Sequence, residues 1–203
     1  SQRIDFLEDR NEKRDALDQN LVRFLKKCGF LPVPVPNVFN GQNLFNLCDA
    51  LNPVGFVLSG GNDIGTFPER DRLESAIIEL ALEKNLPLVG ICRGMQFIVK
   101  FWGGELCPVQ GHVRILHRLK GAEFFPSVVN SYHNSGVKKL PQVLCSLALA
   151  EDGIIEAIIH KTCPVLGIMW HPERNDPFNA KDMVLFKNFL EKGNENCDFV
   201  RWK

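Results

Sequence analysis

A cysteine flanked by two glycines is the most informative local feature of the sequence. Cys92 lies at the centre of the run 90–94, with Gly90 two residues before it and Gly94 two residues after it. The apolar run 87–91 predicts a buried strand, and the spacing after Cys92 predicts a helix, so the cysteine falls on the turn between them. Glycines at these positions allow a sharp, strained turn, and the positive end of the following helix favours a thiolate. The pattern indicates a nucleophile with a pKa lowered from about 8.5 to roughly 3.5–7.5, although a tight turn around a structural cysteine fits it equally well.

A histidine and a glutamate follow a second apolar run. His171 and Glu173 come directly after residues 164–170 and are separated by Pro172. In an α/β sheet, functional groups gather at the carboxyl ends of the strands, so His171 and Cys92 can meet there. A cysteine nucleophile needs an imidazole partner, and that imidazole needs a carboxylate to orient its other nitrogen. We therefore predict a catalytic triad of Cys92, His171 and Glu173.

A pair of glycines ends a third apolar run. Gly60 and Gly61 follow residues 54–59, and glycines expose backbone N–H groups without side-chain obstruction, as an oxyanion hole requires. The second donor would be the amide of Arg93, the residue after the nucleophile. The glycine pair alone describes a plain turn before a helix equally well. Three such motifs at strand ends in one chain favour a shared site.

Strands and helices alternate over the first half of the chain. The spacing of apolar residues predicts helices over 10–28, 42–51, 68–84 and 179–192, and strands over 31–36, 54–59 and 87–91. From Gly103 onward, short β-rich segments separated by turn residues are predicted over 111–117, 125–131, 143–150, 154–160 and 164–170, with a hairpin turn at Asp152 and Gly153. This order predicts an α/β domain with a parallel sheet.

The chain contains no internal repeat and no composition that would mark a linker, so we predict a single domain over 1–203. Residues 1–5 are predicted to form the loop that follows a strand, and we therefore expect a further strand before Ser1.

Composition excludes several classes of function. The chain has 24 Lys+Arg and 24 Asp+Glu, and this balance does not favour nucleic acid or an anionic membrane as a partner. Seven cysteines without CxxC spacing predict a reducing compartment rather than a disulfide framework or a zinc site. They are residues 28, 48, 92, 107, 145, 163 and 197. With no apolar run near the ~18 residues of a bilayer span and no signal peptide, we predict a cytoplasmic protein.

Two histidines are weaker candidates for metal ligands, and three arginines are weaker candidates for binding an anionic leaving group. His112 and His117 are predicted to face the same way on an extended segment, but no carboxylate or cysteine lies at ligand spacing, so we predict no metal site. Arginine suits phosphate recognition, so Arg3, Arg14 and Arg114 could bind an anionic leaving group, although each is more simply a solvated surface charge.

Four motifs together closely resemble the class I glutamine amidotransferases, and within them the γ-glutamyl hydrolase branch (peptidase C26). They are residues 59–63, 90–96, 130–134 and 167–173, and their order and spacing fit over nearly the whole chain. The arginine at position 93 resembles the hydrolase branch more than the synthase-linked glutaminases. The resemblance implies a flavodoxin-like three-layer sandwich, with a central, mostly parallel sheet, helices on both faces, a small antiparallel addition and no cofactor.

The resemblance also implies roles for individual residues. Cys92 would attack the γ-carbonyl carbon, His171 would protonate the leaving nitrogen and then activate water, and Glu173 would hold His171. The backbone amides of Gly61 and Arg93 would form the oxyanion hole. The glutamyl group would be held by Gly60, Gln96, Asn130, Ser131, Tyr132 and His133. Met169 stands where many relatives have glutamine, which leaves the catalytic assignments unchanged.

The leading hypothesis is therefore a hydrolase that cleaves a γ-glutamyl amide bond of a small molecule through a glutamyl thioester. A glutaminase subunit that delivers ammonia to a separate synthase shares the whole triad and is the alternative. A binding module without activity is disfavoured, because the Cys, His, Glu and Gly set is intact. The chain's oligomeric state is left open, and a homo-oligomer is compatible with the sequence.

The sequence does not set the leaving group. Residues 3–5 and 14–19 and the short length resemble family members encoded with surface-polysaccharide genes, which act on a γ-glutamyl nucleotide amidate. Such a substrate, γ-glutamyl-CDP-amidate in capsule polysaccharide biosynthesis, predicts a cationic pocket beside Cys92. A γ-glutamyl-polyamine or γ-glutamyl-aminobutyrate substrate predicts a different charge balance.

Overall fold

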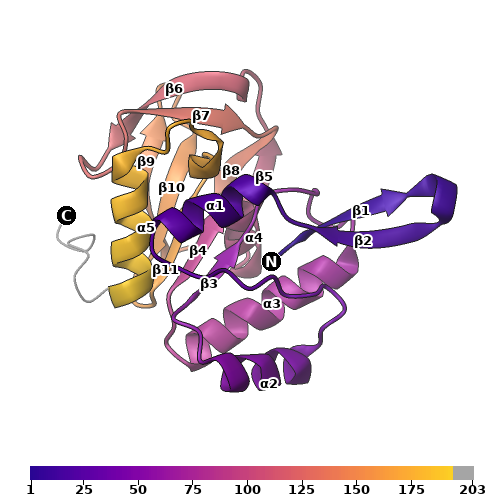
Figure 1. Cartoon of the computed structure of the whole chain (residues 1–203). Helices are drawn as coiled ribbons and strands as arrows, with labels where there is room; N and C mark the ends of the chain where they lie inside the picture. The colour runs from indigo at the N-terminus through magenta and orange to yellow at the C-terminus, as the bar shows by residue number, and fades with distance from the viewer. Residues whose placement is uncertain (194–203) are drawn as a thin grey trace.

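A seven-stranded sheet forms the centre of the molecule (Figure 1). The computed structural model describes residues 1–193, so Cys197 and the end of the predicted domain lie outside the described residues. The strand order across the sheet is β3-β4-β11-β10-β9-β6-β7. In that order the strands are Phe56–Leu58, Leu88–Ile91, Val165–Ile168, Ile155–His160, Leu144–Ala150, Val113–Gly121 and Val128–Tyr132.

The sheet changes direction part-way across. Strands β3, β4 and β11 run parallel to one another, and β10, β9, β6 and β7 then join in antiparallel fashion. The α/β class is confirmed, and the sheet is mixed, with an antiparallel part larger than the small addition that the resemblance implied. The reason is that the second half of the chain supplies strands joined by short turns, which permit only antiparallel neighbours. The hairpin predicted at Asp152 and Gly153 joins β9 to β10.

Helices cover both faces of the sheet and make three layers. Helices α1 (Gln19–Lys27) and α5 (Ala180–Lys192) contact each other on one face (Figure 1). Helices α2 (Gly41–Leu51), α3 (Pro68–Glu83) and α4 (Arg93–Phe101) pack on the other. Residues of β4 alternate between the two cores: Leu88 packs with α2, α3 and α4, whereas Val89 and Ile91 pack with α1 and α5. This alternation is the period-two pattern of a strand buried on both sides.

The helix predicted over 10–28 is wrong in its first half. Strand β1 (Arg3–Leu7), a short 3-10 turn η1 (Glu8–Arg10) and β2 (Glu12–Ala16) form a separate antiparallel hairpin, which projects from the body (Figure 1). Residues 1–5 are therefore mostly strand rather than the loop we expected. Helix α1 starts only after Asp18, whose carboxylate accepts a hydrogen bond from the amide of Asn20 at 2.8 Å. The apolar stripe begins only near this cap, since residues 8–15 are all polar.

The predicted strand over 31–36 is also wrong, because its alternating prolines lack the N–H donors that a sheet needs. This segment instead lines an apolar cavity of about 470 Å³ beside β3, together with residues of α1 and α2. Strands β5 (Glu105–Pro108) and β8 (Ser135–Lys139), which were not predicted, pair with each other. A further strand before Ser1 stays a prediction.

Within residues 1–193, no helix combines the length and the apolar composition that crossing a bilayer would require. The remaining short element is η2, a 3-10 turn at Pro172–Arg174 that directly follows the end of β11.

The glycine at position 94 lets α4 lie directly against β3. A Cβ atom added at Gly94 would be 2.3 Å from the carbonyl oxygen of Leu58, far inside van der Waals contact. We expect Gly94→Ala to lower the free energy of unfolding by about 1–3 kcal/mol, because the helix must shift away from the strand. Urea denaturation measures this loss.

Gly41→Ala is the matched control, since a Cβ at this helical glycine meets no atom of the described structure within 4 Å. It should leave stability unchanged or raise it by about 0.5–1 kcal/mol. Equal effects of the two substitutions would contradict the close approach of α4 to β3.

Candidate active site

Cys92 occupies a strained turn between β4 and α4. Its backbone has φ 50 and ψ −105, a conformation that residues other than glycine rarely adopt. The amide of Cys92 donates to the carbonyl oxygen of Ile168 at 2.7 Å, which ties the turn to the end of β11. Because β4 and β11 pair in parallel, with Ile91 opposite Ile168, the segments that carry Cys92 and His171 emerge side by side. The predicted placement at the carboxyl ends of neighbouring strands is therefore confirmed.

The imidazole of His171 is bound by Glu173 and lies near Cys92. Its Nδ1 lies 2.6 Å from Oε1 of Glu173, and the side chain of Cys92 is near enough to the ring to favour its protonated form. Burial alone lowers the pKa of His171, but the interactions with Cys92 and Glu173 outweigh it and raise the pKa to about 9. Such a histidine stays protonated near neutral pH and can stabilise a thiolate beside it. This arrangement can perform nucleophilic catalysis with proton transfer.

The glycine loop after β3 packs against this imidazole. A Cβ atom added at Gly60 would be 2.8 Å from Cε1 of His171, so only glycine allows this approach. Gly61 has φ +124 and lines the same small cavity as His171 and Glu173. Arg93 is the first residue of α4, where backbone amides have no acceptor within the helix. The assignment of Gly61 and Arg93 to an oxyanion hole stays a prediction.

Asn130 on β7 clamps the backbone of His171. Its side-chain Nδ2 donates to the carbonyl oxygen of His171 at 2.7 Å, and its Oδ1 accepts from the amide of His171 at 2.9 Å. The ring of Tyr132, two residues along, stands edge-on to the imidazole with centroids 5.8 Å apart. Strand β7 thus positions His171 from the side opposite Cys92's own strand. Asn130 acts on the histidine in this structure, and a contact of Asn130 with substrate stays a prediction.

Three other residues predicted to contact substrate form hydrogen bonds with protein groups in this structure. Gln96 donates to the carbonyl oxygen of Ser135 at 2.9 Å, and Ser131 donates to that of His112 at 2.7 Å. The ring of His133 contacts Ser135 and Glu156. Roles for Gln96, Ser131 and His133 in holding a glutamyl group stay predictions, since each would have to exchange these bonds for substrate.

The cavity beside His171 and Glu173 is small, and its walls carry two arginines together with the carboxylates of Asp18 and Glu173. Its volume is about 50 Å³, and Cys92 is 6% exposed. Arg3 and Arg174 line it, and the guanidinium of Arg174 lies 4.3 Å from the ring centroid of Tyr132. Arg174 was not among the predicted residues, although it directly follows the motif that carries His171. Of the arginines predicted from the sequence, only Arg3 lines this cavity. Arg14 pairs with Glu12 on the projecting hairpin, and Arg114 lies in β6.

Residues 12–192 match the sequence profile of the family "Glutamine amidotransferase class-I". The chain belongs to this family. The match spans both the nucleophile turn and the His171–Glu173 motif, so the family resemblance seen in the sequence is confirmed.

Individual relatives support the same family. The chain is 34% identical over 178 residues to the gamma-glutamyl-CDP-amidate hydrolase of Campylobacter jejuni, covering 83% of this chain and 86% of that protein. It is 32% identical over 159 residues to the gamma-glutamyl-gamma-aminobutyrate hydrolase of Escherichia coli O157:H7, covering 64% of this chain and 63% of that protein. A solved structure of a GMP synthase-like protein from Thermoplasma acidophilum matches with a TM-score of 0.69 and 25% identity, over 84% of this chain and 85% of that one.

A buried ion network holds the nucleophile turn to the glycine loop. Arg70 and Arg93 both pair with the carboxylate of Glu74, and Arg93 also pairs with Asp71. Burial lowers the pKa of Arg70 to about 10 and that of Arg93 to about 9. Arg70 and Glu74 are one helical turn apart on α3, a spacing more typical of a solvated surface pair, so the sequence alone did not reveal their role.

The same two arginines bind the loop itself. Arg70 donates to the carbonyl oxygens of Ser59 and Gly60, at 2.8 and 3.0 Å, and Arg93 donates to that of Asn62 at 3.0 Å. The side chain of Arg93 therefore fixes the loop that carries Gly60 and Gly61. The backbone amide of the same residue is predicted to serve the oxyanion hole.

Glu173→Gln should lower the pKa of His171 from about 9 towards its ordinary value of 6.5, because the substitution removes a carboxylate that favours the protonated ring. Titration of the ring Cε1–H signal by NMR measures this. His160, whose pKa burial lowers, is the internal reference and should not change. An unchanged titration of His171 would show that Glu173 does not govern its charge.

The same shift gives stability a pH dependence. Since the pKa of folded His171 lies above 6.5, protonation of this ring stabilises the folded state. That contribution is present in full below about pH 6.5 and is lost as the pH rises through about 9. Between about pH 6.5 and about pH 9, the melting temperature of Glu173→Gln should therefore fall less than that of the wild type.

Proposed function

We propose that this chain hydrolyses a γ-glutamyl amide bond, with Cys92 as nucleophile, His171 as general acid and base, and Glu173 as the residue that orients the imidazole. The observation that carries the proposal is that His171 bonds Glu173 at 2.6 Å and follows the strand β11, to whose end the turn of Cys92 is hydrogen-bonded. Two relatives named as hydrolases of γ-glutamyl compounds support the reaction class.

The geometry supports the following sequence of steps. The thiolate of Cys92 attacks the γ-carbonyl carbon, and the backbone amides of Gly61 and Arg93 stabilise the resulting oxyanion. Protonated His171 then gives its proton to the leaving nitrogen as the carbon–nitrogen bond breaks, which leaves a glutamyl thioester on Cys92. Neutral His171 next takes a proton from water, whose oxygen attacks the thioester. Glutamate leaves, and the Cys92 thiolate and protonated His171 are restored.

We place the leaving group among nucleotide amidates, with γ-glutamyl-CDP-amidate of capsule polysaccharide biosynthesis as the proposed substrate and the cytoplasm as the compartment. Arg174 supports an anionic leaving group, because it lines the cavity beside His171 and can pair with phosphate oxygens. Arg3 lines the same cavity but already pairs with Asp5. The relative from Campylobacter jejuni is named for this substrate. Since a cavity of about 50 Å³ is too small for a glutamyl group, these two exposed side chains must move when substrate enters.

Cys92→Ala should lower kcat by on the order of 10⁴-fold or more, because the thioester can no longer form. Glutamate release from γ-glutamyl substrates with nucleotide, aminobutyrate and unsubstituted amide leaving groups measures this. Cys107→Ala, a partly buried cysteine on β5, is the control and should keep full activity. Activity that survives Cys92→Ala would refute the mechanism.

The same assay separates the hydrolase from a glutaminase subunit. The isolated chain should release glutamate from the nucleotide amidate without any added protein. Turnover restricted to glutamine, and only in the presence of a synthase, would favour the subunit instead.

Arg174→Gln should raise KM for the nucleotide amidate by roughly 10- to 100-fold, the loss expected for one hydrogen bond to a charged group. KM for γ-glutamyl-aminobutyrate, which carries no phosphate, should change much less. Arg14→Gln removes an equivalent charge from the projecting hairpin, outside the cavity, and should change neither value. Equal changes for both substrates would argue against phosphate recognition by Arg174.

A further inference from the structure

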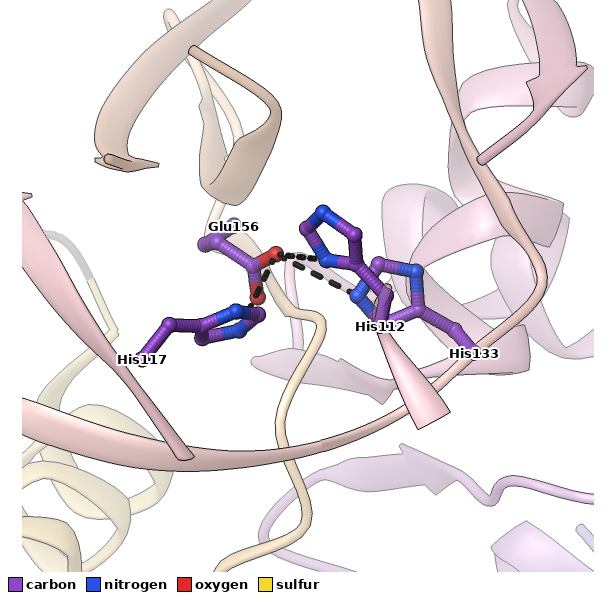
Figure 2. Close-up of side chains that lie close together, drawn as sticks. All are labelled: His112, His117, His133 and Glu156. Atoms are coloured by element: carbon purple, nitrogen blue, oxygen red, sulfur yellow. Dashed lines mark hydrogen bonds and ion pairs between the residues drawn. The ribbon is translucent and has the colours of Figure 1, made fainter. Parts of the chain in front are cut away.

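Three histidines and a glutamate gather where the segments of β6, β7 and β10 meet. Their potential ligand atoms all lie within 4.8 Å of one another. His112 directly precedes β6, His117 lies within it, His133 directly follows β7, and Glu156 lies on β10. Figure 2 shows the three imidazole rings turned towards the carboxylate of Glu156.

A β-bulge brings the two histidines of the β6 segment to the same side. His112 and His117 are five residues apart, so a regular strand would point them to opposite faces, and our expectation that extension alone aligns them is wrong. At Arg114 the pairing between β6 and β7 shifts by one residue, and Arg114 has φ 56. The extra residue restores the common direction. The carboxylate of Glu156 on β10 lies beside these rings. We predicted no metal site because no carboxylate lies at ligand spacing in the sequence, and the fold supplies one from a distant segment.

Contacts outside the cluster orient two of the rings. Nε2 of His112 lies 2.8 Å from Oδ2 of Asp152, and Nδ1 of His133 lies 3.1 Å from the carbonyl oxygen of Ser135. Both outer partners are acceptors, so each ring carries a proton on its outer nitrogen. In the neutral rings, Nδ1 of His112 and Nε2 of His133 therefore present lone pairs to Glu156.

Three of the atoms that face the centre of the cluster lack hydrogen-bond partners among the described residues, while Oε1 of Glu156 lies 3.2 Å from Nε2 of His133. Glu156 is fully buried, and its Oε2 has no hydrogen bond among the described residues. Neither Nδ1 of His112 nor Nε2 of His117 has one there either. A buried carboxylate that faces nitrogen lone pairs is unfavourable unless a cation lies between them. Protonation of a ring relieves one of these contacts at a time, whereas a divalent ion at the centre relieves all of them.

The spacing also suits a metal ion. Around Zn²⁺, ligand distances of about 2.0–2.1 Å in a tetrahedron place neighbouring ligand atoms about 3.3 Å apart. Oε1 of Glu156 lies 3.2 Å from Nε2 of His133, 3.5 Å from Nδ1 of His112 and 3.6 Å from Nε2 of His117. Three imidazole nitrogens and one carboxylate oxygen form a donor set that suits Zn²⁺.

We propose that His112, His117, His133 and Glu156 bind a structural Zn²⁺ ion that joins the segments of β6, β7 and β10. The four side chains complete a tetrahedral set, which is typical of structural rather than catalytic zinc. Asp152 and the carbonyl group of Ser135 orient two of the ligands, as outer-shell partners of metal-bound histidines do. None of the four ligands lines the cavity beside His171. His133 as a zinc ligand would not be free to hold a glutamyl group, so the proposal replaces the substrate contact predicted for His133.

The test uses the full chain, stripped with a chelator and dialysed. On titration with Zn²⁺ alone, we expect one equivalent to bind and the melting temperature to rise with free Zn²⁺. Co²⁺ in place of Zn²⁺ should give the visible absorption of a tetrahedral nitrogen and oxygen site, without the sulfur-to-metal band of thiolate ligands. A stripped chain that stays folded and binds less than a tenth of an equivalent of either ion would overturn the proposal.

Asp152→Asn tests the site without touching a ligand or the core, because Asp152 is exposed on the turn between β9 and β10. It should weaken Zn²⁺ affinity by about 10- to 100-fold. Glu151→Gln, which changes the neighbouring exposed acid on the same turn, is the matched control and should leave the affinity unchanged. His117→Gln should reduce binding further still. Equal Zn²⁺ affinity in the wild type, Asp152→Asn and His117→Gln would place the ion elsewhere and refute the assignment.

Discussion

Two buried arginines share the carboxylate of Glu74, and this ion network sets the position of the two loops that meet at His171. Arg93 comes from the nucleophile turn and Arg70 from α3, and both reach the glycine loop after β3. Removing one partner of such a network typically costs about 3–5 kcal/mol, because the other charge is left buried and uncompensated. The loops are therefore held by buried charges, of which Arg70 depends on Glu74 for its ion pair and Arg93 has a second carboxylate partner in Asp71.

The network matters because the site depends on very short approaches. Gly60 leaves no room for a Cβ atom beside the imidazole ring, and Gly94 leaves none beside the backbone of β3, so both segments pack closer than any other residue would allow. The antiparallel half of the sheet completes this arrangement, since β7 carries Asn130 to the backbone of His171. The parallel strands position Cys92 and His171, and the antiparallel strand β7 fixes the backbone of His171.

The placement of Cys92, His171 and Glu173 could be predicted from sequence because each of their elements is local. A strand end can be recognised directly from the glycines around Cys92 and from the apolar runs that precede Cys92 and His171. In an α/β sheet, the ends of neighbouring parallel strands lie close together. The N-terminal hairpin could not be predicted in this way, since its residues are almost all polar and carry no period that distinguishes β2 from a helix. The spacing of Arg70 and Glu74 is equally uninformative, because only tertiary packing buries the pair. The bulge at Arg114 is a pairing irregularity between two strands, and neither strand alone records it.

The base of the β1–β2 hairpin forms one wall of the cavity, through Arg3 and Ala16, while the reacting groups stand on the central sheet. The hairpin pairs with no strand of that sheet, and Ile4 at its base bonds Asn62 of the glycine loop, whereas residues 8–15 at its far end are exposed and can change without disturbing the packing behind Cys92. Selection for a different amine could therefore act on this appendage while the chemistry is inherited intact. A fold divided in this way lets one catalytic apparatus diversify into enzymes that differ only in what they release.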